Sequence, residues 1–207
     1  LILGERAEYE HESVEMYERG VEAGRRALGE KFFETEVGRF GALVAARPYL
    51  RVRSALATSL WHIGREDEAV QHLLEILRLD ESDLEASRRI LLVILLSCGE
   101  VDRVDVLLAR FPDDRSAMWL YGGALHHLRQ KREPQTNEWL NRALEEYPRV
   151  RPYLLKRRAI PKHAASEEGY EDIVCAIELT ELWASTPGAR EWLEDATGGG
   201  RKSRKRR

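Results

Sequence analysis

The chain has 207 residues, of which 43% are hydrophobic and 33% charged, and its formal net charge is −3. This length suits one domain or two small ones and is enough to bury a core. The longest apolar run, residues 90–96, has seven residues. A membrane-spanning helix needs about 20, so the composition excludes a spanning protein and no membrane partner is expected.

Residues 1–49 are predicted to form helices that make an N-terminal half-repeat or cap. In residues 7–28, Val14, Val21 and Leu28 mark an apolar stripe at helical spacing. A second helix is predicted over 32–46. It should end before Pro48, because the residue preceding a proline is pushed out of the helical region.

Residues 50–83 predict two amphipathic helices on either side of Gly64. A glycine just after the last apolar residue can take the left-handed conformation that ends a helix. The connection is short, so the two helices should form an antiparallel hairpin. Ala57 and Ala69 are the small residues expected where the two backbones approach most closely.

This stretch resembles a tetratricopeptide repeat (TPR), a helical hairpin of about 34 residues. Two positions depart from the family pattern, since Ile76 replaces the usual alanine and Glu81 replaces the closing proline. The matching positions are Leu56, Ala57, Leu60, Gly64, Ala69, Leu73 and the closing Leu77-Arg78-Leu79-Asp80.

Two further units follow at a similar spacing, over residues 84–112 and 116–148. Gly99 marks the turn of the second unit. Trp119, Gly123 and Trp139 match repeat positions in the third, whose turn over 129–137 lacks a glycine. The expected fold class is therefore all-α, with residues 50–148 forming a right-handed stack of three antiparallel helix hairpins, a TPR-like α-solenoid with helical caps.

Residues 149–196 are predicted to form the C-terminal capping helices. A short helix or turn is expected over 153–158, and another short helix over 189–196. The main helix, 168–184, is predicted to use one face made of Ile173, Ala176, Ile177, Thr180 and Trp183. Residues 197–207 are predicted to be a disordered basic tail.

Several stretches together are similar to a narrower group, the suppression-of-tumorigenicity-seven-like TPR proteins and their bacterial relatives. The resemblance covers residues 7–195 and includes ERGVEAGRRALGEKFFETEVGRF, ARPYLRVRSALATSLWHIGR and WASTPGAREWL. It implies a helical repeat domain that acts as an adaptor and has no established chemistry. Asp80-Glu81 stands where the group has Asn-Pro.

The first helices of such stacks line a concave groove that takes peptides or helices. The residues at groove-facing positions are mostly apolar with an arginine and aromatic rim, which suits an amphipathic or extended peptide. The alternative is that the C-terminal helix covers Val93, Leu96 and Leu120. The predicted groove residues are Arg51, Ser54, Thr58, Trp61, His62, Arg89, Val93, Leu96, Leu120, Ala124, His127 and Leu128.

Arg47, Arg51 and Arg53 flank Tyr49 and could together bind an acidic or phosphate group. The alternative interpretation pairs them with nearby carboxylates such as Glu34 and Glu36. The lysine and asparagine clamp of chaperone-binding TPR proteins is not expected, because Ser54, Thr58, Ala86 and Ile90 occupy its positions.

No catalytic motif points to an enzyme, a cofactor or a metal. The six histidines are scattered, and His126 falls on a packing position. No HExxH, nucleophile elbow or phosphate-binding glycine loop occurs. Cys98 and Cys175 are expected to be buried reduced thiols, and the chain opens without signal-peptide features, so a cytoplasmic location is expected.

The function expected from these features is a non-enzymatic scaffold, monomer or homodimer, that binds a protein or peptide in the groove. The alternative is a regulatory protein associated with nucleic acid through the basic tail alone. The acidic remainder of the chain does not favour phosphate binding by the fold. The tail charges are Arg201, Lys202, Arg204, Lys205, Arg206 and Arg207.

Overall fold

The computed structural model describes residues 2–161 and 169–196, and in these ranges it is built of eleven α-helices and one 3-10 helix. The predicted all-α class is confirmed. The chain divides into two compact units, residues 1–94 and 95–207, with the boundary inside α5 (Ser87–Cys98). Each unit is described by itself. The predicted tail, residues 197–207, lies outside the described residues.

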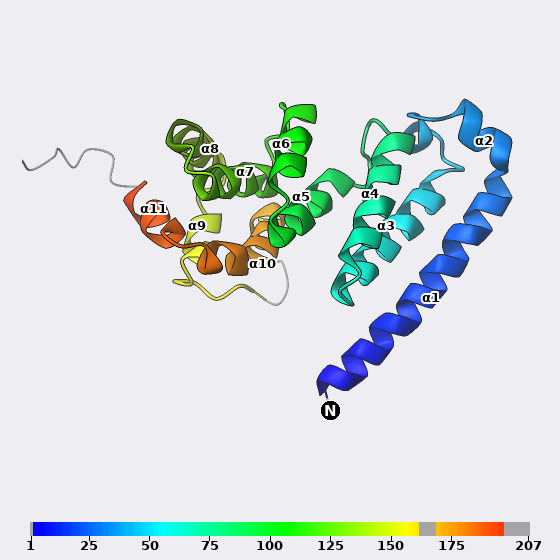
Figure 1. Ribbon diagram of the computed structural model, residues 1–207, viewed down its shortest axis with the longest axis horizontal. Helices are drawn as coiled ribbons and strands as arrows, with labels where there is room; N and C mark the ends of the chain where they lie inside the picture. The colour runs from blue at the N-terminus through cyan, green and yellow to red at the C-terminus, as the bar shows by residue number, and fades with distance from the viewer. Residues whose placement is uncertain (1, 162–168, 197–207) are drawn as a thin grey trace, which may run out of the picture. The chain divides into compact units, whose positions relative to one another are not determined.

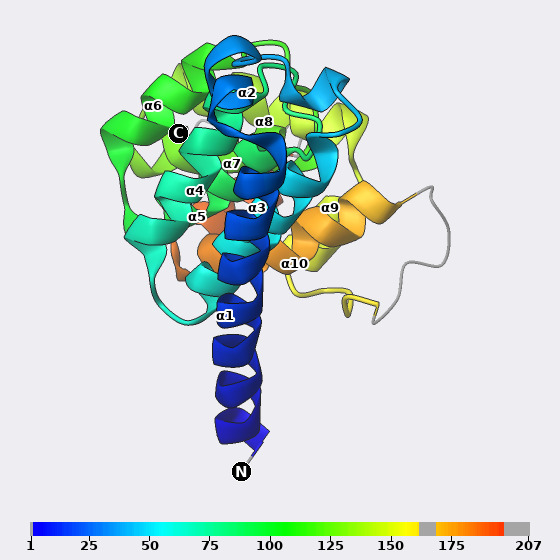
Figure 2. The same cartoon turned by 90° about the vertical axis from the view of Figure 1, so that its right-hand side faces the viewer.

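Unit 1 is built around α3 (Arg47–His62), which packs against both α1 (Ile2–Leu28) and α4 (Glu66–Leu79). Figures 1 and 2 show α1 lying along α3. Small residues allow this approach, because a Cβ on Gly20 would lie 2.7 Å from Cγ2 of Val52. The hairpin of α3 and α4 matches the prediction, and Ala57 and Ala69 at its interface are fully buried.

The segment predicted as one helix over 32–46 is not continuous, so that prediction is wrong. α2 (Glu30–Thr35) ends early, and only a short 3-10 helix, η1 (Phe40–Ala42), follows before α3. The reason is Gly41, which lies against the carboxylate of Asp80, so that an added Cβ would sit 2.5 Å from Oδ2 of Asp80. The segment therefore packs on the end of α4.

Asp80 and Glu81, which depart from the narrower family pattern, both hold this end of α4. The Asp80 carboxylate accepts hydrogen bonds from the backbone N–H of Ser82 at 3.2 Å and of Leu84 at 2.8 Å. The backbone N–H of Glu81 donates to the carbonyl oxygen of Gly38 at 3.0 Å. A proline has no N–H to donate, so the closing proline of the repeat would lose this bond.

Unit 2 contains α6 (Val101–Arg110), α7 (Ala117–Arg129), α8 (Glu133–Glu146), α9 (Val150–Leu154), α10 (Tyr170–Ser185) and α11 (Ala189–Asp195). α7 packs against α8 on one side and α10 on another, and α9 also packs against α10. α7 is consequently buried from Ala117 to His127. Arg129 at its end donates to the carbonyl oxygen of Leu96 at 2.7 Å and to Oγ1 of Thr186 at 2.9 Å.

The predicted packing face of α10 is confirmed in part, because Ala176, Thr180 and Trp183 are buried. Ile177, expected on the packing face, is 55% exposed. The buried face also includes Asp172, Cys175 and Leu179, which were not predicted. The full buried set is Asp172, Cys175, Ala176, Leu179, Thr180 and Trp183.

Lys131 takes the place of the turn glycine that the third predicted unit lacks. Gly64 and Gly99 have φ values of 77° and 72°, and Lys131 has φ 55° at the corresponding place after α7. Its backbone N–H donates to the carbonyl oxygen of Leu128 at 2.9 Å, as at many helix ends. A residue with a side chain is strained in this conformation.

We therefore expect Lys131→Gly to raise the free energy of unfolding by about 1 kcal/mol, because glycine adopts positive φ without strain. Urea unfolding monitored by circular dichroism measures this. The matched control is Lys131→Ala, which shortens the side chain but keeps the strain. Equal stabilisation by both variants would show that the lysine side chain, and not the backbone, is responsible.

Candidate functional site

The predicted groove residues of α3 remain accessible in unit 1. Arg51 and His62 are exposed, and Ser54, Thr58 and Trp61 are partly buried. The rings of Trp61 and His62 are neighbours, with centroids 5.8 Å apart. Arg51 forms an ion pair with Glu85, with Nε 3.3 Å from Oε1. α3 therefore presents aromatic and charged side chains at the surface.

The predicted groove residues further along the chain are mostly buried. Val93, Leu96 and Leu120 are each 2% exposed, and His127 is 9% exposed. In unit 2, α10 packs against α7, as the rings of Trp183 and Tyr121 show with centroids 6.4 Å apart. This contact shows that α10 covers the side of α7 that carries Tyr121. That the C-terminal helix covers Leu120 stays a prediction. Ala124 is fully buried, whereas Arg89 and Leu128 are partly buried.

The three arginines around Tyr49 interact with different partners. Nε of Arg47 donates to the carbonyl oxygen of Gly41 at 3.0 Å, and Arg51 pairs with Glu85. The guanidinium of Arg53 donates to the hydroxyl of Tyr49 and lies 5.8 Å from the centre of its ring. These contacts do not bring the three side chains together on one anion.

Two predicted features concern histidine and cysteine. His126 lies in the core as expected, with Nε2 2.8 Å from Oδ1 of Asp105. The same carboxylate accepts two hydrogen bonds from Arg132, at 2.6 and 2.9 Å, which hold the pKa of Asp105 far below its usual range. Neither Cys98 nor Cys175 forms a disulfide in the described part of the chain, and only Cys175 is buried, so the prediction of a buried Cys98 is wrong.

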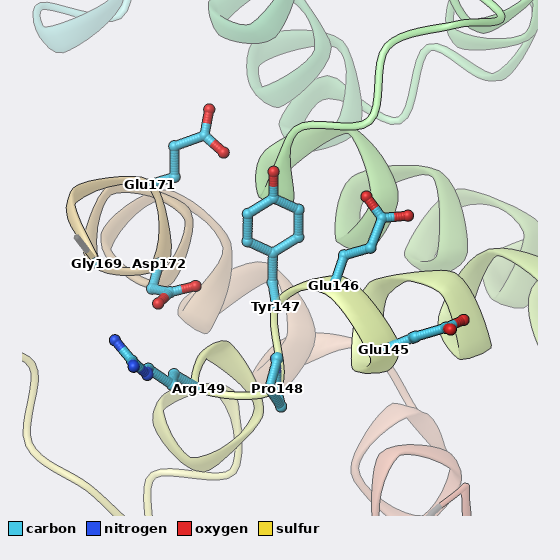
Figure 3. A pocket seen from close by; sticks show the side chains of 8 residues that line it. All are labelled: Glu145, Glu146, Tyr147, Pro148, Arg149, Gly169, Glu171 and Asp172. Atoms are coloured by element: carbon cyan, nitrogen blue, oxygen red, sulfur yellow. The ribbon is translucent and has the colours of Figure 1, made fainter. Parts of the chain in front are cut away.

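A pocket of about 480 Å³ lies in unit 2 between the end of α8 and the start of α10 (Figure 3). Its volume is within the range of about 300 to 1,000 Å³ typical of ligand sites. Four carboxylates and one guanidinium line it, so we call it the acidic pocket. Its lining residues are Glu145, Glu146, Tyr147, Pro148, Arg149, Gly169, Glu171 and Asp172.

One wall of the acidic pocket is held in place by hydrogen bonds from α7 and the loop before it. The hydroxyl of Tyr121, on buried α7, donates to the carbonyl oxygen of Tyr147 at 3.0 Å. Arg115 donates to the carboxylate of Glu146, with Nε 3.0 Å from Oε1. The turn from Tyr147 to Arg149 is therefore fixed relative to α7.

The opposite wall is the first turn of α10, where Asp172 has an unusual environment. Its side chain is on the buried face of the helix and the residue is only 8% exposed. Its Oδ1 atom is buried and accepts no hydrogen bond from the described part of the chain. Burial raises the pKa of Asp172, against the opposing influence of Arg149, which lowers it.

Sequence reasoning did not find this pocket, although one signal was present. Asp172 stands at helical spacing with Cys175, Ala176 and Leu179, which makes a carboxylate part of an apolar stripe. The other wall comes from a turn more than twenty residues earlier in the chain, which periodicity does not relate to α10. In the described residues no group of three or more histidine, cysteine or carboxylate side chains has a metal-binding arrangement.

Within the described ranges, no helix is long and apolar enough to cross a membrane. Comparison with known proteins returns no matching family model, no matching curated protein and no matching solved structure. The TPR resemblance of the sequence therefore stays a prediction.

Proposed function

We propose that the protein is a non-enzymatic adaptor of the TPR type that binds a segment of a partner protein. The observation that carries this proposal is the accessible face of α3. The TPR resemblance implies that α3, as the first helix of its hairpin, lines the binding groove. This helix presents Arg51, Trp61 and His62 at the surface. Aromatic and arginine side chains dominate the binding energy of many protein interfaces.

The helical hairpins support the same proposal. The α3 and α4 hairpin has the alanine contact and the glycine turn of a TPR unit, and α7 packs against α8 in the same way. We propose that the hairpins over residues 50–148 belong to a right-handed TPR-like stack. α10 then serves as a capping helix, since it already covers α7.

The proposal is tested by capturing partners from host lysate on the immobilised full-length chain, followed by mass spectrometry. Trp61→Ala should reduce capture of the specific partners at least tenfold while the circular dichroism spectrum stays unchanged. Gln71→Ala, at an exposed position of α4, is the matched control and should capture normally. Equal capture by all three chains would contradict a binding role for α3.

The second candidate is a regulatory protein associated with nucleic acid. The sequence observation behind it is the run of six basic residues among positions 201–207, which contrasts with the acidic remainder. Binding of duplex DNA or RNA that falls steeply with salt and is lost in a chain ending at Gly200 would favour this function. Partner capture that is unchanged by the same truncation would favour the adaptor.

A further inference from the structure

Among the described residues that line the acidic pocket, carboxylates outnumber cationic side chains. Glu145, Glu146, Glu171 and Asp172 line it together with the guanidinium of Arg149. Glu146 is paired with Arg115, which comes from the segment before α7. The excess of carboxylates attracts a positively charged group and repels an anion.

Asp172 is an independent sign that something polar belongs in this pocket. Buried carboxylates in folded proteins normally have hydrogen-bond partners, and an unpaired buried acceptor costs free energy. Oδ1 of Asp172 has no partner within the described residues, although the residue is more than nine-tenths buried and lines the pocket. Figure 3 shows its carboxylate between the start of α10 and the turn that carries Tyr147 and Arg149. Oδ1 itself is covered, so a donor entering the pocket would satisfy it once the Asp172 carboxylate turns toward the pocket.

We infer that the acidic pocket receives an arginine or lysine side chain from a basic segment of the partner protein. This inference rests on the proposed adaptor function and names the chemistry of its partner. Both side chains are cationic donors, and a guanidinium bonded to a carboxylate makes stronger hydrogen bonds than a neutral pair does. The aromatic ring of Tyr147 in the pocket wall can contact the apolar stem or the planar head of such a side chain.

Arg149 opposes the binding of a cation in the acidic pocket. Its guanidinium faces the same pocket and contributes the electrostatic influence that lowers the pKa of Asp172. An incoming cation is therefore repelled by Arg149 and attracted by the carboxylates. Removing the charge of Arg149 should strengthen binding, whereas removing the charge of Asp172 should weaken it.

The test is a titration of the full-length protein with the peptide Ac-Ala-Ala-Arg-Ala-Ala-NH2, followed by NMR chemical shifts of the α10 backbone amides. The matched peptide replaces arginine with citrulline, which has nearly the same shape but no charge. We expect the arginine peptide to bind at least tenfold more tightly than the citrulline peptide. Asp172→Asn should weaken arginine-peptide binding at least tenfold, and Arg149→Gln should strengthen it about threefold.

Two controls separate this inference from general electrostatics and loss of folding. Asp102→Asn removes one exposed negative charge outside the pocket lining and should change the affinity less than twofold. Asp172→Asn should keep the circular dichroism spectrum of the wild type, because burial already disfavours the charged form that the variant removes. Equal binding of the arginine and citrulline peptides, or equal weakening by Asp172→Asn and Asp102→Asn, overturns the inference.

A chain ending at Gly200 distinguishes the source of the cation. We expect it to bind the arginine peptide with the same affinity as the full chain. At least tenfold tighter binding after truncation would assign the pocket to the basic residues 201–207 and overturn the assignment to a partner. If the pocket binds no cation while Trp61→Ala still abolishes partner capture, this inference fails and the adaptor function stands.

Discussion

Replacing Gly123 with alanine is expected to lower the free energy of unfolding by about 3 kcal/mol, the range in which an overpacked interface loses stability. Gly123 lies in α7, and its Cα hydrogens face the indole of Trp139 on α8. A Cβ added there would lie 2.6 Å from Cζ3 of Trp139, with Cε3 closer still. Alanine otherwise stabilises a helix interior relative to glycine by about 1 kcal/mol, so any net loss reports the clash. Urea unfolding at neutral pH measures it.

A double-mutant cycle identifies the indole as the cause. Trp139→Leu removes the ring atoms that the new methyl group would meet and should make the Gly123→Ala change much less costly. The coupling free energy between the two positions should therefore exceed about 1 kcal/mol, as for residues in direct contact. Additive effects of the two substitutions would mean that the helices separate to accommodate the methyl group without strain.

The pairing of the two helices on either side of this contact is the kind of feature that the sequence predicts well. Trp119, Gly123 and Trp139 were matched to repeat positions, and the pairing of α7 with α8 follows from a short turn between two apolar helices. The hairpin around Gly64 was predicted for the same reason. Local periodicity and turn residues determine these contacts, because each lies within one helical hairpin.

Features that depend on separate parts of the chain were not predictable in this way. The segment before α3 looked helical because its apolar spacing is helical, but Gly41 lies against Asp80, nearly forty residues later. Asp105 bonds to His126 and Arg132, which lie on or beside other helices. The acidic pocket combines the end of α8 with the start of α10. Such contacts need the tertiary arrangement, which sequence spacing does not provide.

Acidification from pH 7 to 4.5 is expected to destabilise unit 2, with His127 as a main cause. The pKa of His127 is lowered to about 4, mainly by burial and also by the nearby charges of His126 and Arg132, whereas Asp105 and Glu138 act in the opposite direction. In the unfolded chain, histidine takes up a proton near pH 6.5. The unfolded state therefore binds more protons between pH 6.5 and 4, and the stability that is fully present above this window is lost as the pH falls through it. This difference between the pKa of His127 in the folded and unfolded states corresponds to a loss of roughly 2 to 3 kcal/mol in the free energy of unfolding.

His127→Phe separates the histidine from other acid effects. The variant keeps a ring beside Trp139, whose centre lies 5.7 Å from that of His127, and removes a buried Nδ1 that has no hydrogen-bond partner in the described residues. Urea unfolding at pH 7.5, 6.5, 5.5 and 4.5 should show a smaller loss of stability in this variant than in the wild type. The control is His11→Gln, which changes an exposed histidine and should follow the wild type. The ordinary aspartate pKa is about 3.9, which is below pH 4.5. Protonation of Asp105 therefore contributes little to the loss of stability in this range. A His127→Phe profile parallel to that of the wild type would contradict a neutral, buried His127.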